Sequence, residues 1–189
     1  MVTFPKMWIP VALTLVCTHL LVNGFEGEQW SRVQQLREQI EDSEAANIVR
    51  QGCLEPYVTV GDQCLFFATF AELSYQDARQ MCHSLDGELA AVLTATRLKN
   101  IIDYINENGI AGHSFWLGGS DAAQEGVWLW TDGQRVPMGA PFWGFVKLDV
   151  LEPDGGAAEN CLLLNADGFH YFRDSSCSLL RTPLCMYAQ

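Results

Sequence analysis

The sequence predicts an α+β domain with antiparallel strand pairing over residues 51–189. Two segments with helical spacing of apolar residues are followed by several short strand-like segments that do not alternate with helices. Six cysteines lie in this region, as is typical of a domain held by disulfides. The segment 134–160 has no clear periodicity, and loops of that length are usually functional. We expect two helices packed on short antiparallel sheets, with one long irregular loop.

The first elements of the domain are two strands and a helix. Residues 57–70 are rich in aromatic and β-branched side chains and predict two strands around a turn at Gly61-Asp62. A helix follows Ser74, which is a suitable N-cap, with Asp77 at the third helical position. The apolar face of this helix consists of Ala78, Met81, Cys82 and Leu85.

A second helix begins near Thr94 or Thr96 and ends at Gly109, since threonine caps helix starts and glycine commonly follows helix ends. Its apolar face consists of Leu98, Ile101, Ile102 and Ile105. From Ser114 onward the pattern changes to short strands. These strands cover residues 116–119, 127–130, 161–164 and 184–187.

Composition restricts the classes of function. The chain is 49% hydrophobic and 18% charged, which indicates a globular protein and not a disordered one. Its formal net charge is −12, from 23 acidic and 11 basic residues. We expect neither nucleic-acid binding nor adhesion to an anionic membrane, because both depend on lysine and arginine. An acidic surface fits a secreted protein or one that binds cations such as calcium.

The first 24 residues have the features of a secretory signal peptide. Lys6 is their only charged residue, and a mostly apolar stretch from Met7 to Val22 follows it. This stretch is shorter than the roughly 20 apolar residues that cross a bilayer. Val22 and Gly24 fit the small positions of a cleavage site, so we expect cleavage after Gly24 and secretion without a membrane span. A retained N-terminal membrane anchor is the alternative.

Residues 25–50 predict a short amphipathic helix or linker. Its apolar residues, at three- and four-residue spacing, are Trp30, Val33, Leu36 and Ile40. Such a helix suits a coiled-coil neck that forms a homo-oligomer through residues 30–48. A lone helix or a frayed tail fits equally well, because the segment holds fewer than three heptads.

The cysteine count is consistent with secretion. Cys17 lies in the predicted signal peptide, and the other six form an even set, which in an oxidising compartment indicates three disulfides. Six cysteines allow 15 pairings, and their spacing does not choose among them. Zinc is not expected, because no Cys-x-x-Cys motif is present. The six are Cys53, Cys64, Cys82, Cys161, Cys177 and Cys185.

Acidic side chains are concentrated in residues 149–174, where six of them accompany a single basic residue, Arg173. Calcium takes six to eight oxygen ligands, largely carboxylates and carbonyls. Pro153 lies between Glu152 and Asp154 and restrains the backbone that carries these two carboxylates. This segment therefore predicts a calcium site, with an acidic loop that binds no ion as the alternative.

Several short motifs, taken in order along the chain, resemble those of the C-type lectin-like domain. They are Trp116-Leu117-Gly118-Gly119, Glu152-Pro153-Asp154, Glu159-Asn160-Cys161 and Asp174. The match covers about residues 53–187 and includes the order of the six cysteines. It implies the C-type lectin-like fold in its long form and a secreted single-domain lectin of the invertebrate type. The implied disulfides are Cys53–Cys64, Cys82–Cys185 and Cys161–Cys177.

The resemblance also implies which residues bind calcium and sugar. In sugar-binding members, one calcium ion is held by these motifs and takes two vicinal sugar hydroxyls as further ligands. The matching positions, expected to bind both calcium and carbohydrate, are Glu152, Asp154, Glu159 and Asp174. Asp121 and Glu125 resemble the ligands of an auxiliary calcium site, for which an ordinary polar loop is the alternative.

Two positions depart from the family pattern. Asp154 replaces the usual Asn, and Phe172-Arg173-Asp174 replaces Trp-Asn-Asp. Arginine has no acceptor atom and cannot ligate a metal. Either water or the Asp174 backbone completes the calcium shell, or Arg173 pairs with Glu152 or Asp154 and supplies positive charge in place of calcium.

The mixed Glu-Pro-Asp motif leaves the sugar open, because the resemblance links Glu-Pro-Asn to mannose-type and Gln-Pro-Asp to galactose-type ligands. Retention of Glu152 slightly favours mannose-type glycans. Three tryptophans of the strand region are expected in the core more than on a sugar face. They are Trp128, Trp130 and Trp143.

These observations predict a secreted, calcium-dependent lectin that recognises glycans on microbial surfaces in innate immunity. The alternative is a calcium-independent module of the same fold that binds a protein partner or a surface, with Arg173 replacing the charge of calcium. An enzyme is not expected, since the sequence has no motif of a hydrolase, a phosphate-binding loop or a metal triad.

Overall fold

The computed structural model describes residue 35, residues 52–147 and residues 150–187. The predicted signal peptide (1–24) lies outside these residues, as does the predicted oligomerising segment (30–48) apart from residue 35. None of the described helices combines the length and the apolar character needed to cross a membrane.

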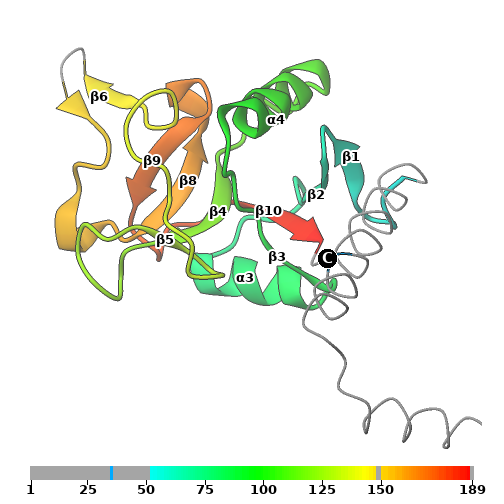
Figure 1. The fold of residues 1–189 in the computed structure, drawn as a ribbon, viewed down its shortest axis with the longest axis horizontal. Coiled ribbons are helices and arrows are strands. Elements are labelled where there is room, and N and C mark those ends of the chain that lie inside the picture. Colours follow the sequence, from blue (N-terminus) through cyan, green and yellow to red (C-terminus); the bar gives the residue numbers. More distant parts are fainter. Residues whose placement is uncertain (1–34, 36–51, 148–149, 188–189) are drawn as a thin grey trace, which may run out of the picture. The chain divides into compact units, whose positions relative to one another are not determined.

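The larger sheet has eight strands, most of which follow one path in the order β1-β2-β10-β4-β8-β9 (Figure 1). β3 is attached to β10, and β5 is attached to β4. The strands are β1 (Val58–Val60), β2 (Gln63–Phe67), β3 (Gly87–Leu89), β4 (Phe115–Ser120), β5 (Leu129–Trp130), β8 (Cys161–Asn165), β9 (Tyr171–Ser175) and β10 (Thr182–Tyr187). With two helices beside this sheet, the predicted α+β class is confirmed.

Strand direction differs from the expectation at one place. β10 pairs antiparallel with β2 and β3, but it runs parallel to β4, with Thr182 opposite Phe115. The other pairs of the sheet are antiparallel. β10 thus lies between β2 and β4. Because β10 and β4 are far apart in the sequence, no local sequence pattern predicts their pairing.

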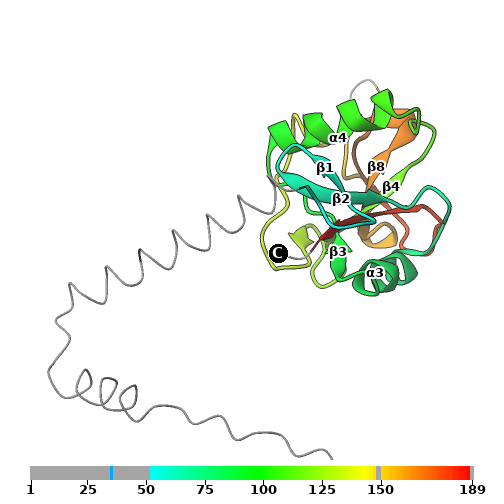
Figure 2. The same cartoon turned by 90° about the vertical axis from the view of Figure 1, so that its right-hand side faces the viewer.

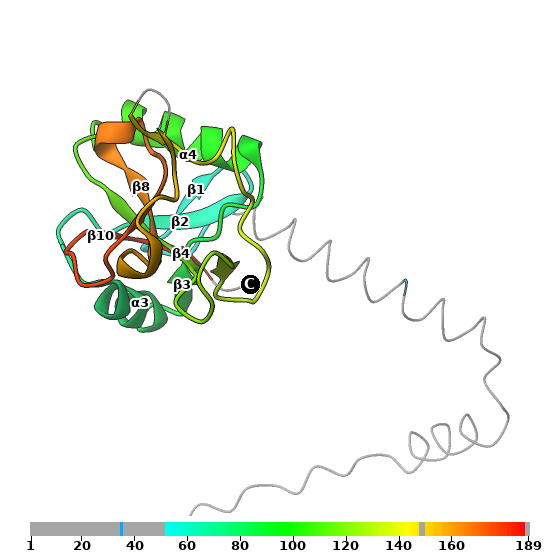
Figure 3. The ribbon, with the colours of Figure 1, turned by 90° about the vertical axis from the view of Figure 1, so that its left-hand side faces the viewer.

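The two helices begin at the predicted caps. α3 (Tyr75–His83) follows Ser74, whose hydroxyl accepts a hydrogen bond from the Asp77 amide at 3.3 Å. α4 (Ala95–Glu107) follows Thr94, whose hydroxyl accepts from the Arg97 amide at 3.2 Å. This decides between Thr94 and Thr96 as the start of the second helix. The helices lie on opposite sides of the sheet (Figures 2 and 3).

The segment 134–160 is less irregular than expected. It contains a two-stranded hairpin, β6 (Phe145–Lys147) and β7 (Val150–Leu151), in which Phe145 lies opposite Leu151. A short 3-10 helix, Gly156–Ala158, follows it. The hairpin escapes a sequence-based prediction because strands this short leave no measurable alternation.

The core consists of two clusters on the two sides of the sheet elements. One includes Ile101, Leu117 and Phe172, and the other includes Trp116 together with the disulfide Cys82–Cys185. Trp116 is fully buried, and its indole N–H donates to the Leu73 carbonyl at 2.8 Å. The remaining strand-region tryptophans are also buried, with exposures of 3%, 2% and 2% for Trp128, Trp130 and Trp143.

Three disulfides close the domain. They pair the cysteines as the family resemblance implies, namely Cys53–Cys64, Cys82–Cys185 and Cys161–Cys177. The second bond joins α3 to β10 across 103 residues of sequence, and the third joins β8 to the turn that follows β9. The last bond fixes β8 to the chain just after β9, the strand that carries Asp174.

Candidate calcium and carbohydrate site

Two strands and one hairpin place the predicted site residues. β9 pairs with β8 along its whole length, with Leu162 opposite Asp174. The hairpin β6–β7 is joined to β9 because the Gly144 amide donates to the Phe172 carbonyl at 2.9 Å. The Glu152 amide in turn donates to the Gly144 carbonyl at 3.0 Å. These bonds bring Glu152, at the end of β7, to the edge of the strand that carries Asp174.

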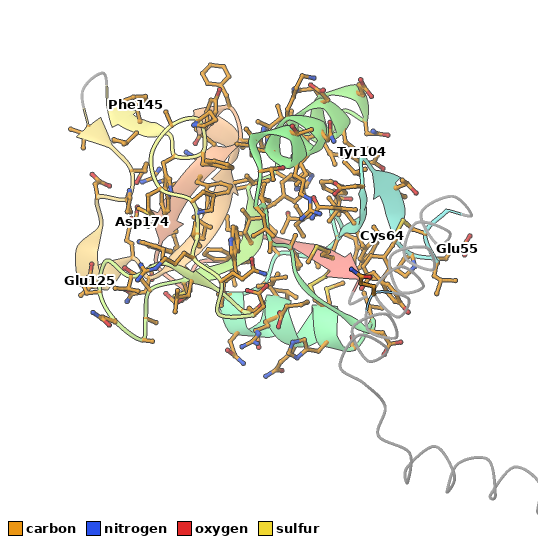
Figure 4. All side chains as sticks on the ribbon, in the orientation of Figure 1. Glu55, Cys64, Tyr104, Glu125, Phe145 and Asp174 are labelled. Atoms are coloured by element: carbon orange, nitrogen blue, oxygen red, sulfur yellow. A yellow bond between two sulfur atoms is a disulfide. The ribbon has the colours of Figure 1, made fainter. Side chains whose placement is uncertain are left out.

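Three of the four residues expected to bind both calcium and carbohydrate, which we call the primary site residues, lie close together. Glu152, Asp154 and Asp174 each offer one carboxylate oxygen, and these oxygens lie within 4.8 Å of one another. Among the side chains that the structure describes, no other acidic or metal-ligating group of three or more is this close. Glu152 and Asp174 are buried, with exposures of 3% and 1%, whereas Asp154 is exposed. We call these three residues the acidic cluster; Figure 4 labels Asp174 within it.

Backbone amides hold Asp174 in place. One of its carboxylate oxygens accepts from the Asp154 amide at 3.2 Å, and the other accepts from the Gly155 amide at 2.8 Å. These bonds tie the chain that follows the cis Glu152–Pro153 bond to β9. The buried Asp174 side chain therefore holds the main chain at Asp154 and Gly155 close to β9.

The fourth primary residue, Glu159, lies beside the cluster but outside it. A Cβ atom on Gly155 would lie 2.5 Å from both Cβ and Cγ of Glu159, so the Glu159 side chain packs directly against this glycine. Burial and the nearby Asp174 carboxylate raise the pKa of Glu159. The charge of the cluster thus acts on the Glu159 carboxyl. Because Gly155 has no side chain, Glu159 has room to lie beside the cluster.

Glu152 is the most perturbed carboxyl of the site. Burial first, and then the adjacent Asp174 carboxylate, raise the pKa of Glu152 to about 9. Its Oε2 atom is buried and has no hydrogen-bond partner among the described residues. Loss of the Glu152 proton leaves a buried carboxylate, which is costly unless a bound cation balances its charge. The cluster residues therefore fit a calcium ion.

Arg173 lies next to Glu152, one of the two partners considered for it. Its Nε is 3.3 Å from Oε1 of Glu152, and its side chain is 40% exposed. The guanidinium works to lower the pKa of Glu152, but burial and Asp174 outweigh it. The Arg173 guanidinium is thus in contact with the cluster but does not bring the pKa of Glu152 back to its usual range.

The auxiliary residues lie on a neighbouring loop. Asp121 is 2% exposed; one of its carboxylate oxygens accepts from the Gly126 amide at 2.9 Å, and the other has no partner among the described residues. Glu125 approaches the 3-10 helix after the cluster, since its Oε1 lies 3.9 Å from the Cβ position of Gly156. Figure 4 shows Glu125 and Asp174 on the same side of the domain. No third acidic side chain of the described residues joins Asp121 and Glu125 as closely as the acidic cluster is joined.

Sequence reasoning did not single out the residues that connect the hairpin to the cluster. The Gly144 amide donates to Phe172, and the Gly144 carbonyl accepts from Glu152. A Cβ atom on Gly144 would lie 3.3 Å from Cβ of Tyr171. The hairpin and β9 also carry exposed aromatic side chains, Phe145 at 64% and Tyr171 at 39%. Nothing local in the sequence marks these residues, because their role depends on contacts between β9 and the hairpin.

Comparison with known proteins agrees with this architecture. The sequence model of the family described as Lectin C-type domain matches residues 71–187. The galactose-specific lectin nattectin of Thalassophryne nattereri is 26% identical over 143 residues, which are 74% of this chain and 85% of that protein.

Two solved structures share the fold. A Ca²⁺-dependent type II antifreeze protein in its Ca²⁺-free form aligns with a TM-score of 0.59 and 21% identity, covering 72% of this chain and 100% of that one. A calcium-independent type II antifreeze protein aligns with a TM-score of 0.57 and 20% identity, covering 72% and 94%. At such identities the likeness concerns the fold alone.

Proposed function

The chain belongs to the lectin C-type domain family, and we propose that it is a secreted protein that binds carbohydrates by means of calcium. The family consists of binding modules and not of enzymes, in agreement with the absence of catalytic motifs in the sequence. The signal-like features of residues 1–24 support secretion.

The observation that carries the proposal is the convergence of three carboxylates at one point. Glu152, Asp154 and Asp174 bring oxygen atoms within 4.8 Å of one another, although two of these residues are buried. Like charges this close repel unless a proton or a cation lies between them. We propose that these residues, with Glu159 beside them, hold a calcium ion. When bound, the ion supplies a positive centre to which two neighbouring hydroxyls of a sugar bind.

The same residues orient the sugar. Glu152 and Asp154 are acceptors when ionised, so they take hydrogen bonds from sugar hydroxyls and donate none. We propose mannose-type glycans as slightly favoured over galactose-type glycans, and glycans of microbial surfaces as the targets in innate immunity. The relative nattectin is named as galactose-specific, so a specificity test must include both sugars. The three buried tryptophans are not available for stacking on a sugar.

A second candidate function follows from Arg173. Its contact with Glu152 at 3.3 Å is the arrangement expected if the guanidinium replaces the charge of calcium. In that case the domain is a calcium-independent module that binds a protein partner or a surface. The fold does not choose between the two, because the antifreeze proteins that share it include a Ca²⁺-dependent and a calcium-independent one.

Calorimetric titration with calcium, followed by methyl α-mannoside and methyl α-galactoside, tests the proposal on the secreted protein. Calcium that binds only the native state adds about 2.7 kcal/mol of stability at a hundredfold excess over Kd, so the melting temperature should rise between EDTA and millimolar calcium. Asp174→Asn should abolish the rise. Asp167→Asn, which removes the same charge at an exposed position outside the cluster, should keep it.

Three outcomes are informative. A calcium-dependent rise in melting temperature with sugar binding supports the lectin. Identical melting temperatures in EDTA and calcium exclude the calcium site. Ligand binding that persists in EDTA favours the module with a built-in counterion.

A further inference from the structure

Arg173 presents a guanidinium group beside the acidic cluster. It lies in β9 between Phe172 and Asp174, which are buried with exposures of 0% and 1%. Because side chains alternate along a strand, Arg173 projects away from these two neighbours, and its side chain is 40% exposed. The guanidinium is thus open to solvent next to the place where we propose that a sugar binds.

One side of the guanidinium faces the cluster. Nε of Arg173 lies 3.3 Å from Oε1 of Glu152, and the positive charge works to lower the pKa of Glu159 as well as that of Glu152. Nη1 and Nη2 make no hydrogen bond to any residue that the structure describes. The N–H donors on these two atoms therefore remain for a ligand.

The unpaired side of an arginine fork binds oxyanions best. Arginine pairs with planar oxyanions such as carboxylates through two parallel N–H···O bonds, and such charge-assisted bonds are about twice as strong as bonds between neutral groups. A single neutral sugar hydroxyl offers neither the charge nor the two oxygens. A sugar that carries an anionic substituent therefore suits Arg173 better than a neutral one.

Bound calcium removes the electrostatic obstacle to an anion at this site. The three ionised carboxylates of the cluster outweigh one guanidinium, but Ca²⁺ and the guanidinium together balance them, and Glu159 leaves only a small excess of negative charge. The net charge of −12 on the whole chain also opposes an anion. At physiological ionic strength the screening length is about 8 Å, so distant charges act weakly while the contact with Arg173 is kept.

We propose that the site selects acidic sugars, such as uronic acids and sugar sulfates, and that Arg173 binds their anionic substituent. A uronic acid carries its carboxylate on C5, next to the carbon that bears the 4-hydroxyl, so the carboxylate lies close to a hydroxyl pair that includes this group. Arg173 thereby becomes a specificity-determining residue. This inference rests on the proposed function and names the ligand class of the same site.

Calorimetry in millimolar calcium and physiological salt compares methyl α-mannuronoside with methyl α-mannoside, which share their ring hydroxyls and differ at C6. The matching galacturonoside and galactoside are measured in parallel, and methyl α-mannoside 6-sulfate distinguishes a sulfate from a carboxylate as the preferred anion. We expect the acidic glycoside to bind about tenfold more tightly than its neutral partner, equivalent to about 1.4 kcal/mol.

Three variants assign this ratio of affinities to Arg173. Arg173→Gln should reduce the ratio to near one. Arg173→Lys, which keeps the charge but not the fork, should retain part of it. Arg135→Gln removes one positive charge at an exposed position outside the cluster and should leave the ratio at its wild-type value.

Equal affinities of the acidic and neutral glycosides for the wild type overturn the inference and leave the proposed function standing. A ratio that survives Arg173→Gln, or that Arg135→Gln lowers as much, overturns it as well, as does a ratio for Arg173→Lys as low as that for Arg173→Gln. Binding of no glycoside overturns the inference together with the proposed function. A preference for acidic glycosides that persists in EDTA and is lost in Arg173→Gln supports the role of Arg173 and contradicts the calcium part of the proposed function.

Discussion

Nε of Arg173 lies 3.3 Å from Oε1 of Glu152, a glutamate whose side chain is 3% exposed. Despite this contact, burial and Asp174 keep the pKa of Glu152 near 9. Arg173 thus has two opposing effects on the site. It offsets part of the negative charge of the cluster, and it repels any cation that the cluster binds.

Replacement of Arg173 by Asn should tighten calcium binding. The change removes a positive charge next to the cluster and introduces an amide oxygen that can ligate the ion. We expect a tenfold gain or more, which needs only about 1.4 kcal/mol. Calorimetry measures the gain, with Arg135→Asn as a control for the loss of one positive charge. No gain, together with a lower melting temperature of the variant in EDTA, would show that Arg173 is the counterion of Glu152.

The pKa of Glu152 makes the calcium-free protein less stable at high pH. The folded-state value of about 9 exceeds the ordinary value of 4.5, so the folded state holds a proton that the unfolded state releases. The stability from this group is full below about pH 4.5 and is lost as pH rises towards 9. Glu152→Gln cannot ionise, so its stability in EDTA should increasingly exceed that of the wild type between pH 5 and pH 9. Urea unfolding measures the difference, and a difference that does not change with pH contradicts this assignment.

Calcium affinity should rise between pH 6 and pH 8. A proton on Glu152 competes with the metal for the same oxygens, and metal binding must displace it. The raised pKa of Glu152 places this competition above the usual carboxylate range. Calorimetry at both pH values tests the shift. Equal affinities at pH 6 and pH 8 would mean that Glu152 is already ionised at pH 6.

Gly155→Ala should weaken calcium binding with little effect on the fold. The added methyl group would lie 2.5 Å from Cβ of Glu159 and displace that side chain from its place beside the cluster. We expect about a tenfold loss of calcium affinity, equivalent to about 1.4 kcal/mol. Gly112→Ala, where a Cβ meets nothing within 4 Å, is the matched control. Unchanged affinity in the Gly155 variant would exclude Glu159 as a ligand.

Gly118→Ala should destabilise the fold itself. A Cβ at position 118 would lie 2.6 Å from the Leu89 carbonyl oxygen, which is backbone and cannot rotate away. Overpacking of this kind typically costs 1–3 kcal/mol, so we expect a loss of about 2 kcal/mol. Gly112→Ala should stay within about 0.5 kcal/mol of the wild type. Thermal unfolding of both variants in calcium and in EDTA measures the effect, and equal stability of the two would contradict the close packing of β3 on β4.

Features that depend on neighbouring residues were predictable from the sequence. The caps at Ser74 and Thr94 bond to amides three residues later, and the turn at Gly61 joins two adjacent strands. The acidic residues of the Glu-Pro-Asp segment were likewise visible as a pattern of residue types. Such signals act over a few residues, and the chain carries them before it folds.

The tertiary structure alone decided the features that join distant segments. β3 and β9 were not predicted as strands, because β3 is three residues long and pairs with β10 almost a hundred residues later, and β9 carries Arg173 and Asp174 among its apolar residues. The contact of Arg173 with Glu152 instead of Asp154 depends on how the hairpin meets β9. The raised pKa of Glu152 depends on burial and on a carboxylate 22 positions away. The sequence determined which charged groups are available, and the fold set their charge state, because pKa depends on solvent exclusion and on distances that exist only after folding.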